Sequence, residues 1–376
     1  MKRNNMPSPL SAIRGSLVGG AVGDALGYPV EFMRWQDIQK EFGPEGIRKY
    51  ALDYETGLAL VSDDTQMTLF TANGLLLYDT AKALGKASMA PAGYIYQAYR
   101  DWYFCQRDKR KMPPRNTSWL SELPESHARR APGNTCLGAL QMGDPGGLDH
   151  PINFSKGCGG VMRVAPVALW GHGKISLDET ALLGAKAAAL THTHPLGYIP
   201  AAALAYMVCK AAFSPDADDL FALAEECGDA MKRLFPEEGF LPDFLRLMER
   251  AAEYSRSDRP DPSSIHALGG GWTGEEAFAI ALYCCLKYPD DFSRAMTAAV
   301  NHSGDSDSTG AVAGNILGAW LGYEAIEEKW LAQLELKSVL LAISQDLYTG
   351  CPQMENGAIP DEAWNKKYTG YLPEER

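Results

Sequence analysis

The chain has 376 residues, of which 46% are hydrophobic, 22% charged and 10% aromatic. This composition excludes disordered, collagen-like and coiled-coil proteins and is typical of a folded protein with a large core. Aspartate and glutamate outnumber lysine and arginine by 47 to 35, a formal net charge of −12, which disfavours nonspecific binding to nucleic acid or to anionic membranes.

Cysteine usage and the apolar runs predict the compartment. The eight cysteines contain no CxxC pair, and a chain of this size needs no disulfide bonds, so we expect reduced thiols. The N-terminal stretch begins like a secretory signal, but the segment between Arg14 and Asp24 is too short and too rich in glycine. The longest later apolar run, Tyr198 to Cys209, is about half of the roughly 20 residues that cross a bilayer. We expect a cytoplasmic protein that does not bind membranes.

The first predicted helix carries a row of glycines. Gly15, Gly19, Gly23 and Gly27 recur at every fourth residue and therefore share one helix face. Each costs about 0.5–1 kcal/mol relative to alanine, which the close approach of another helix or of a ligand would offset. For the glycines alone we favour tight helix packing. The helix is expected to end at Gly27, which leaves Glu31 on the following loop.

A first acidic cluster opens the next predicted helix. Ser62 stands where an N-cap is expected, Asp63 and Asp64 occupy the first turn, and the apolar pattern continues to about Tyr78. Taken alone, the cluster is best interpreted as a capping serine with two acids that the helix dipole favours.

The segment from residue 105 to residue 135 is locally basic and interrupted by four prolines, which predicts a loop. Its cations are Arg107, Lys109, Arg110, Lys111, Arg115, Arg129 and Arg130. Runs of like charge usually face water, so a solvated insertion is favoured over a role in guiding substrate.

A glycine-rich loop, Gly157-Cys158-Gly159-Gly160, precedes an apolar helical stretch. Exposed backbone N–H groups at a helix start can hold an anion, so a phosphate cradle is a reasonable interpretation. The loop is neither a Walker motif nor a dinucleotide fingerprint, because GxxxxGK[ST] is absent and no predicted strand precedes it.

Most of the remaining chain has helical periodicity. The clearest stretches are ETALLGAKAAAL, AAALAYMVCKAAF, DDLFALAEECGDAMKRLF, EEAFAIALYCCL and SRAMTAAV. Strand-like alternation, internal repeats and linkers are not evident. We therefore predict one all-α domain over residues 1–376, with a motif-bearing core at about 11–350 and a packed C-terminal tail at 351–376.

A second acidic cluster, with Asp305, Asp307 and Ser308, opens a helix rich in small residues. If the two clusters converge, four carboxylates share one site and cannot all ionise without a cation. All the donors are hard oxygens, which suits Mg²⁺ or Mn²⁺ rather than zinc. Two such ions would balance the four carboxylates, and six side chains would leave coordination positions open for water and substrate, as in a catalytic site.

A mononuclear site of the non-haem iron kind would instead recruit His192, His194 or His302 with one carboxylate. His192 and His194 are two residues apart, not the four that place two ligands on one helix face. We rank this alternative below the two-metal site.

Five stretches together, in this order, resemble the ADP-ribosylglycohydrolase family. They are GSLVGGAVGDALGYPVEF, SDDTQMTLF, SKGCGGVMRVAPVAL, LTHTHP and NHSGDSDSTGAVAGNILGAWLG. The resemblance implies a single large orthogonal bundle of helices around a central binuclear Mg²⁺ or Mn²⁺ site. The metal ligands that it implies are Ser62, Asp63, Asp64, Asp305, Asp307 and Ser308.

The same resemblance implies the remaining site residues. Glu31 matches an acidic position involved in substrate gating or acid–base chemistry, and Asp63, Asp64 and Asp305 complete the implied catalytic set. The glycine-rich loop would lie toward the diphosphate of the substrate. The implied substrate contacts are Gly133, Asn134, Gly157, Cys158, Gly159, Gly160, Met162, Arg163 and His192.

These observations predict a metal-dependent hydrolase that releases ADP-ribose from a modified protein side chain or small molecule. Cleavage at the anomeric carbon passes through an oxocarbenium-like state, for which the cations would activate water while Glu31 moves a proton. The alternatives are a two-metal phosphoester or pyrophosphate hydrolase and a non-catalytic, crystallin-like binder of ADP-ribose. The residues leave open the acceptor, the choice between Mg²⁺ and Mn²⁺, and the oligomeric state.

Overall fold

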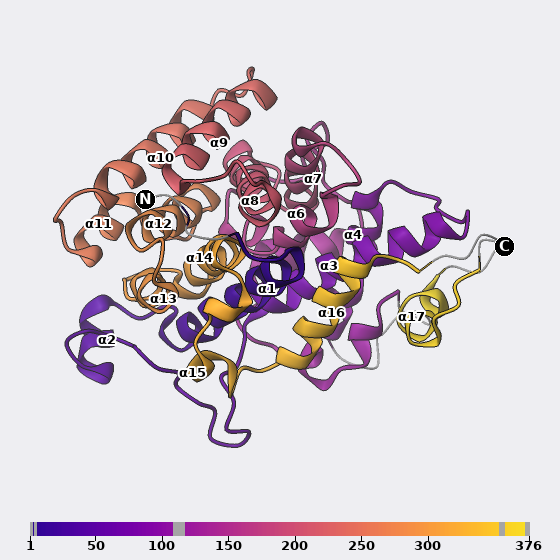
Figure 1. The fold of residues 1–376 in the computed structure, drawn as a ribbon, viewed down its shortest axis with the longest axis horizontal. Coiled ribbons are helices and arrows are strands. Elements are labelled where there is room, and N and C mark those ends of the chain that lie inside the picture. Colours follow the sequence, from indigo (N-terminus) through magenta and orange to yellow (C-terminus); the bar gives the residue numbers. More distant parts are fainter. Residues whose placement is uncertain (1–2, 4–5, 108–116, 353–357, 373–376) are drawn as a thin grey trace.

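The computed structural model describes residues 3, 6–107, 117–352 and 358–372. Within these residues the regular structure is helical without strands, apart from isolated backbone bridges of Ala59 with Leu334 and of Gly157 with Thr273, which confirms the all-α prediction. The helices, shown in Figure 1, are α1 (Pro9–Gly27), α2 (Trp35–Phe42), α3 (Asp63–Ala83), α4 (Pro91–Cys105), α5 (Asn134–Met142), α6 (Ala165–Gly171), α7 (Leu177–Ala189), α8 (Pro195–Phe213), α9 (Leu220–Leu234), α10 (Leu241–Ser255), α11 (Asp261–Leu268), α12 (Gly274–Lys287), α13 (Phe292–Val300), α14 (Ser306–Leu321), α15 (Glu328–Leu331), α16 (Lys337–Thr349) and α17 (Glu362–Lys367).

Helices α1 and α14 lie side by side at the centre of the molecule (Figure 1). The glycines of α1 face those of α14 so closely that a Cβ on Gly23 would lie 2.0 Å from the carbonyl oxygen of Gly310. A Cβ on Gly15 would similarly lie 2.1 Å from the carbonyl oxygen of Gly318. The glycine row therefore serves helix packing, as predicted, and α1 ends at Gly27 as expected.

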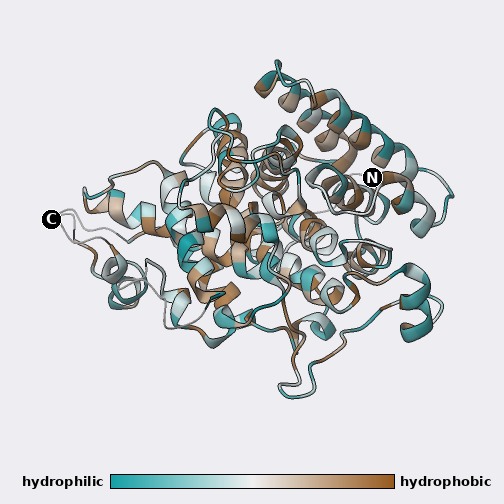
Figure 2. Cartoon of the chain, turned by 180° about the vertical axis from the view of Figure 1, so that it is seen from behind, coloured by the Kyte–Doolittle hydropathy of each residue, from teal (hydrophilic) through white to brown (hydrophobic). Residues whose placement is uncertain are grey.

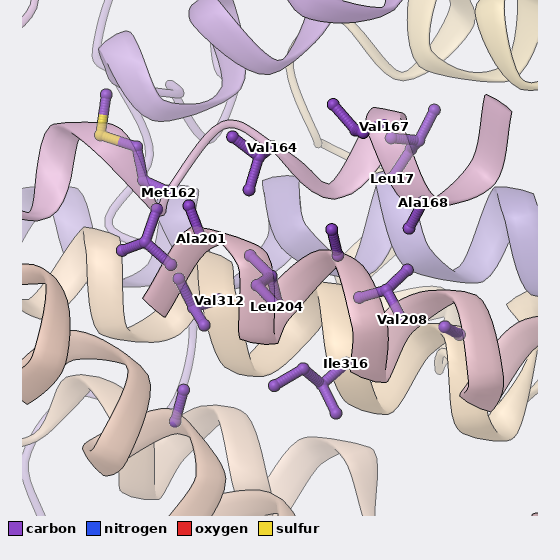
Figure 3. Packing of buried hydrophobic residues seen from close by; sticks show 14 of the residues in the cluster. Leu17, Met162, Val164, Val167, Ala168, Ala201, Leu204, Val208, Val312 and Ile316 are labelled. Carbon is purple, nitrogen blue, oxygen red and sulfur yellow. The ribbon is translucent and has the colours of Figure 1, made fainter. Parts of the chain in front are cut away.

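Helix α8 forms much of the core against α6, α7 and α14. Figure 3 shows Ala201, Leu204 and Val208 of α8 packed with Val312 and Ile316 of α14. This helix has 19 residues, longer than the apolar run from which we predicted it, and it is long and apolar enough to span a membrane by composition. Because 94% of its apolar stretch is buried inside the protein, the apolar side chains of α8 pack in the protein core.

The outer helices bury one face and expose the other. In Figure 2 the peripheral helices carry brown, hydrophobic residues along one side and teal, hydrophilic residues along the other. Helix α3 runs to Ala83, past the predicted end near Tyr78, because Ala81 and Thr80 are still buried. The described part of the C-terminal tail packs as expected: Trp364 is 3% exposed and donates a hydrogen bond to Thr80 Oγ1 at 2.9 Å.

Candidate metal and substrate site

The two acidic clusters occupy the first turns of α3 and α14. Ser62 caps α3, its hydroxyl accepting a hydrogen bond from the Asp64 backbone N–H at 3.2 Å, as predicted. Helix α14 is capped by Asp305, whose carboxylate accepts a hydrogen bond from the Ser308 N–H at 3.3 Å. Since α1 packs along α14 and also contacts α3, both helix starts are brought to one place.

The acidic side chains of both clusters line a single cavity of about 620 Å³. They are Asp63, Asp64, Asp305 and Asp307; Glu31, from the loop after α1, and Ser308 lie in the same wall. Oxygen atoms of Glu31, Asp305 and Asp307 all lie within 4.8 Å of one another. The convergence expected from the sequence is therefore present, and it can hold a metal ion.

Burial and mutual repulsion disfavour the ionised form of these carboxyl groups. Burial, with the nearby charges of Asp307 and Asp305, raises the pKa of Glu31 to about 10. Burial and Asp307 raise the pKa values of Asp63 and Asp64 well above the ordinary range, and burial also raises that of Asp305. So many buried carboxyl groups close together require either protons or cations.

A further carboxylate supports the first cluster from behind. Asp24, on α1, is fully buried and accepts hydrogen bonds from the Ser62 N–H at 2.9 Å and from the Thr65 N–H at 3.1 Å. It satisfies donors at the start of α3 that have no partner within the helix. The side chains of Asp63 and Asp64 are therefore free to face the cavity. Asp24 directly follows Gly23 of the glycine row, and no local pattern predicted that it would cap a different helix.

The other predicted substrate segments line the same cavity. Gly133, Asn134, Gly157, Cys158, Gly159, Met162 and His192 all border the cavity. A Cβ on Gly159 would lie 3.0 Å from the His192 ring, so glycine is needed for the loop to pass the imidazole. Burial, with Arg163, lowers the pKa of His192 to about 3, which leaves the ring neutral.

Three predicted site residues do not border the cavity. Arg163 is fully buried in the core, where its guanidinium donates to Thr191 Oγ1 at 2.7 Å and lies 4.3 Å from the centre of the Tyr99 ring. The expected contact of Arg163 with substrate is thus replaced by a packing role. Gly160 faces the Gly197 carbonyl instead, and Ser62 is a fully buried cap whose side chain is hydrogen-bonded to Asp307 of the cavity wall.

The geometry disfavours the histidine alternative, because the group of described side chains that could hold a metal ion, Glu31, Asp305 and Asp307, contains no histidine. His302 is buried against Thr309 Oγ1 at 2.9 Å, and His194 caps α8 by accepting a hydrogen bond from the Leu196 N–H at 3.0 Å. Neither borders the acidic cavity, and His192 is the histidine that does.

Two exposed aromatic residues at the cavity were not predicted from the sequence. Phe32 is 70% exposed and Trp272 is 42% exposed, and their rings stack with centroids 5.4 Å apart. Phe32 and Ala131, both in the cavity wall, also have positive φ values of 66° and 50°, which non-glycine residues adopt rarely. The run of glycines at 269–271, directly before Trp272, was the available signal for this loop.

The described cations of the basic segment, residues 105–135, include one that lines the cavity and one that stabilises a nearby loop. Arg129 borders the cavity. Arg130 is paired with Glu335 and donates to the Val61 carbonyl at 3.0 Å, so it fixes the loop before α3. Lys109, Arg110, Lys111 and Arg115 lie outside the described residues.

The fold and the cavity define an all-α protein with a buried acidic centre suited to cations. The family model for ADP-ribosylglycohydrolase matches residues 5–356, and the chain belongs to this family. Family membership indicates a glycohydrolase that acts on ADP-ribose linkages.

Individual relatives are distant in sequence but cover the chain. It is 27% identical to the ADP-ribosyl-[dinitrogen reductase] glycohydrolase of Rhodospirillum rubrum over 335 residues, 88% of this chain and 92% of the relative. It is 24% identical to the ADP-ribosylhydrolase ARH3 of Bos taurus, covering 90% and 93%. A solved structure of an ADP-ribosylglycohydrolase-related protein complex has the same fold, with a TM-score of 0.62 at 24% identity over 91% of this chain and 98% of that one.

Proposed function

We propose that this protein is a metal-dependent hydrolase that cleaves the glycosidic bond between ADP-ribose and a modified acceptor and releases ADP-ribose. The observation that carries the proposal is the convergence of five carboxyl groups, from α3, α14 and the loop after α1, on one cavity. The named relatives, a glycohydrolase of ADP-ribosyl-dinitrogen reductase and an ADP-ribosylhydrolase, support the same chemistry.

The residues in the cavity fit divalent cations. Asp64 Oδ2 and Glu31 Oε2 are both buried and have no hydrogen-bond partner among the described residues, and a buried carboxylate oxygen of this kind is stabilised by a positive ion. We propose that Asp63, Asp64 and Asp305, together with Asp307 and the hydroxyls of Ser62 and Ser308, hold two Mg²⁺ or Mn²⁺ ions. When bound, such ions supply polarisation of water and of the substrate's hydroxyl groups.

The chain's own groups would then orient the substrate and move a proton. Glu31 lies at the cavity wall beside Asp307, where it would give a proton to the departing acceptor atom or take one from the attacking water. The backbone of Gly157 and Gly159 would lie along the diphosphate, and the neutral ring of His192 would accept or donate one hydrogen bond. Phe32 and Trp272 would exclude water from the mouth of the cavity.

The proposal is tested with a panel of defined conjugates, including ADP-ribosylarginine and ADP-ribosylserine, each incubated with Mg²⁺ or Mn²⁺ and with a chelator. We expect at least one conjugate to yield ADP-ribose with its diphosphate intact, as measured by mass spectrometry. The chelator should abolish release, and added Mn²⁺ should restore it. Formation of AMP and ribose phosphate would instead indicate phosphoester chemistry. Release that persists in excess chelator would contradict the metal dependence.

A further inference from the structure

Sulfur atoms lie directly against the acidic cluster. Cys158 Sγ is 2.8 Å from Asp305 Oδ2, and Met162 Sδ is 3.8 Å from Ser308 Oγ. Both sulfur-bearing side chains border the cavity that the carboxyl groups line. The donor set of the centre therefore includes sulfur as well as oxygen. Hard cations alone were expected because all the predicted donors were oxygen atoms.

The position of the Cys158 thiol is fixed by the backbone around it. The Cys158 N–H donates to the Trp272 carbonyl at 3.2 Å, and the Gly274 N–H donates to the Lys156 carbonyl at 2.8 Å, so this loop is clamped to the segment before α12. Six of the eight cysteines are buried, and the other two, Cys158 and Cys351, are partly exposed. Among these two, Cys158 is the one that borders the acidic cavity.

An independent observation in the same cavity points to a positive ligand. Asp64 is 2% exposed, and its Oδ2 atom has no hydrogen-bond partner in the part of the chain that the structure describes. Leaving a buried polar atom without a partner destabilises the fold, and a coordinated cation would remove that cost. Asp64 and Cys158 thus both border the cavity, the first with a hard oxygen atom and the second with a soft sulfur atom that contacts Asp305.

We propose that Cys158 and Asp305 add a thiophilic cation site to the centre, so that an ion of the Zn²⁺ class binds there in competition with Mg²⁺ or Mn²⁺. This inference rests on the metal centre of the proposed function. On binding, the thiol loses its proton to solvent and a sulfur–metal bond forms, with no change in oxidation state. The bound ion would exclude the harder ion from Asp305 and lower hydrolysis.

The geometry requires only a small adjustment. Zinc–sulfur and zinc–oxygen bonds of about 2.3 and 2.1 Å around a tetrahedral ion separate the two donor atoms by about 3.5 Å. The present contact of 2.8 Å, with the thiol directed at the carboxylate, has to open by less than about 1 Å. Thiolate donors select zinc over magnesium or manganese, so the preference follows from the donor type.

The test is a titration of the full-length, chelator-treated protein with Cd²⁺, which gives an ultraviolet charge-transfer absorption when it binds a thiolate. We expect the wild-type protein and Cys351→Ser to show this absorption and Cys158→Ser and Cys158→Ala to lack it. Calorimetry should show that Cys158→Ser loses about tenfold or more in Zn²⁺ affinity, while its Mn²⁺ affinity changes by less than about threefold. Circular dichroism establishes that the variants are folded.

The outcomes separate this inference from the proposed function. A charge-transfer absorption that survives in both Cys158 variants, or wild-type Zn²⁺ affinity in Cys158→Ser, would overturn the thiophilic site. Wild-type protein that releases ADP-ribose with Mn²⁺ but shows no absorption with Cd²⁺ would also overturn it, and would leave the proposed function intact. A protein that gives the absorption with Cd²⁺ but releases no ADP-ribose with Mn²⁺ would contradict the proposed function alone.

Discussion

The carboxylate of Asp24, on α1, accepts the backbone N–H of Ser62 at the start of α3 at 2.9 Å. The same carboxylate accepts from the Thr65 N–H and hydroxyl, so one buried side chain caps a helix that belongs to a different part of the chain. This contact decides where Asp63 and Asp64 point, because the acids of the first turn no longer have to serve as caps.

Replacement of Asp24 is expected to weaken the metal centre. In Asp24→Asn the amide nitrogen cannot accept from Ser62 or Thr65, so the first turn of α3 loses part of its support. Outer groups of this kind typically contribute 10–100-fold to metal affinity, and we expect a loss of about tenfold in Mn²⁺ affinity by calorimetry. Thr65→Ser, which keeps the hydroxyl, should bind Mn²⁺ like the wild-type protein. Unchanged affinity in Asp24→Asn would refute the positioning role.

The contact of α1 with α14 leaves no room for a methyl group. Gly23→Ala would place its Cβ 2.0 Å from the Gly310 carbonyl oxygen, so the helices must separate. We expect the free energy of unfolding to fall by about 1–3 kcal/mol or more in chemical denaturation. Gly138→Ala is the matched control, because Gly138 is helical and exposed with nothing within 4 Å of its added Cβ. That control should be neutral or stabilising by up to about 1 kcal/mol, and an equal loss in both variants would argue against close packing.

Removal of one carboxylate charge from either cluster should abolish most activity. Asp63→Asn and Asp305→Asn each take a donor from the cavity while preserving shape, so ADP-ribose release with Mn²⁺ should fall about 100-fold or more. The control is Asp229→Asn, whose side chain is 72% exposed on α9. It should retain wild-type rates, and wild-type rates in either cluster variant would count decisively against the proposed site.

The stability of the metal-free protein should depend on pH in a direction set by the buried acids. Their pKa values are raised by folding, from 3.8 to about 7 for Asp24 and from 4.5 to about 10 for Glu31. Above about pH 4 the unfolded chain releases protons that the folded chain retains, so the free energy of unfolding falls as pH rises through 7.

Thermal unfolding measures this effect. In chelator, Tm should fall between about pH 5 and pH 8, and the rise in Tm on adding Mn²⁺ should be larger at the higher pH. Asp305→Asn removes one of the buried carboxyl groups, so its decline with pH should be shallower. A Tm in chelator that increases over this range would contradict the burial of un-neutralised carboxyl groups.

Local features of the fold were predictable because helix formation is governed by neighbours in the chain. The periodicity predicted helices α7, α8, α9, α12 and α13. The cap at Ser62 and the end of α1 at Gly27 follow from local chemistry. The glycine row indicated close helix packing. The single-domain organisation and the cytoplasmic location stay predictions.

The all-α class, the helix starts and the residue types of an acidic centre could be predicted from the amino-acid sequence, because periodicity, capping and side-chain chemistry are properties of short segments. The packing of the folded chain was needed to show that the clusters share a cavity, that Asp24 caps α3, that Arg163 lies in the core and that Cys158 touches Asp305. Those relationships join segments far apart in the chain, and they depend on how closely α1 and α14 pack, which no local pattern specifies.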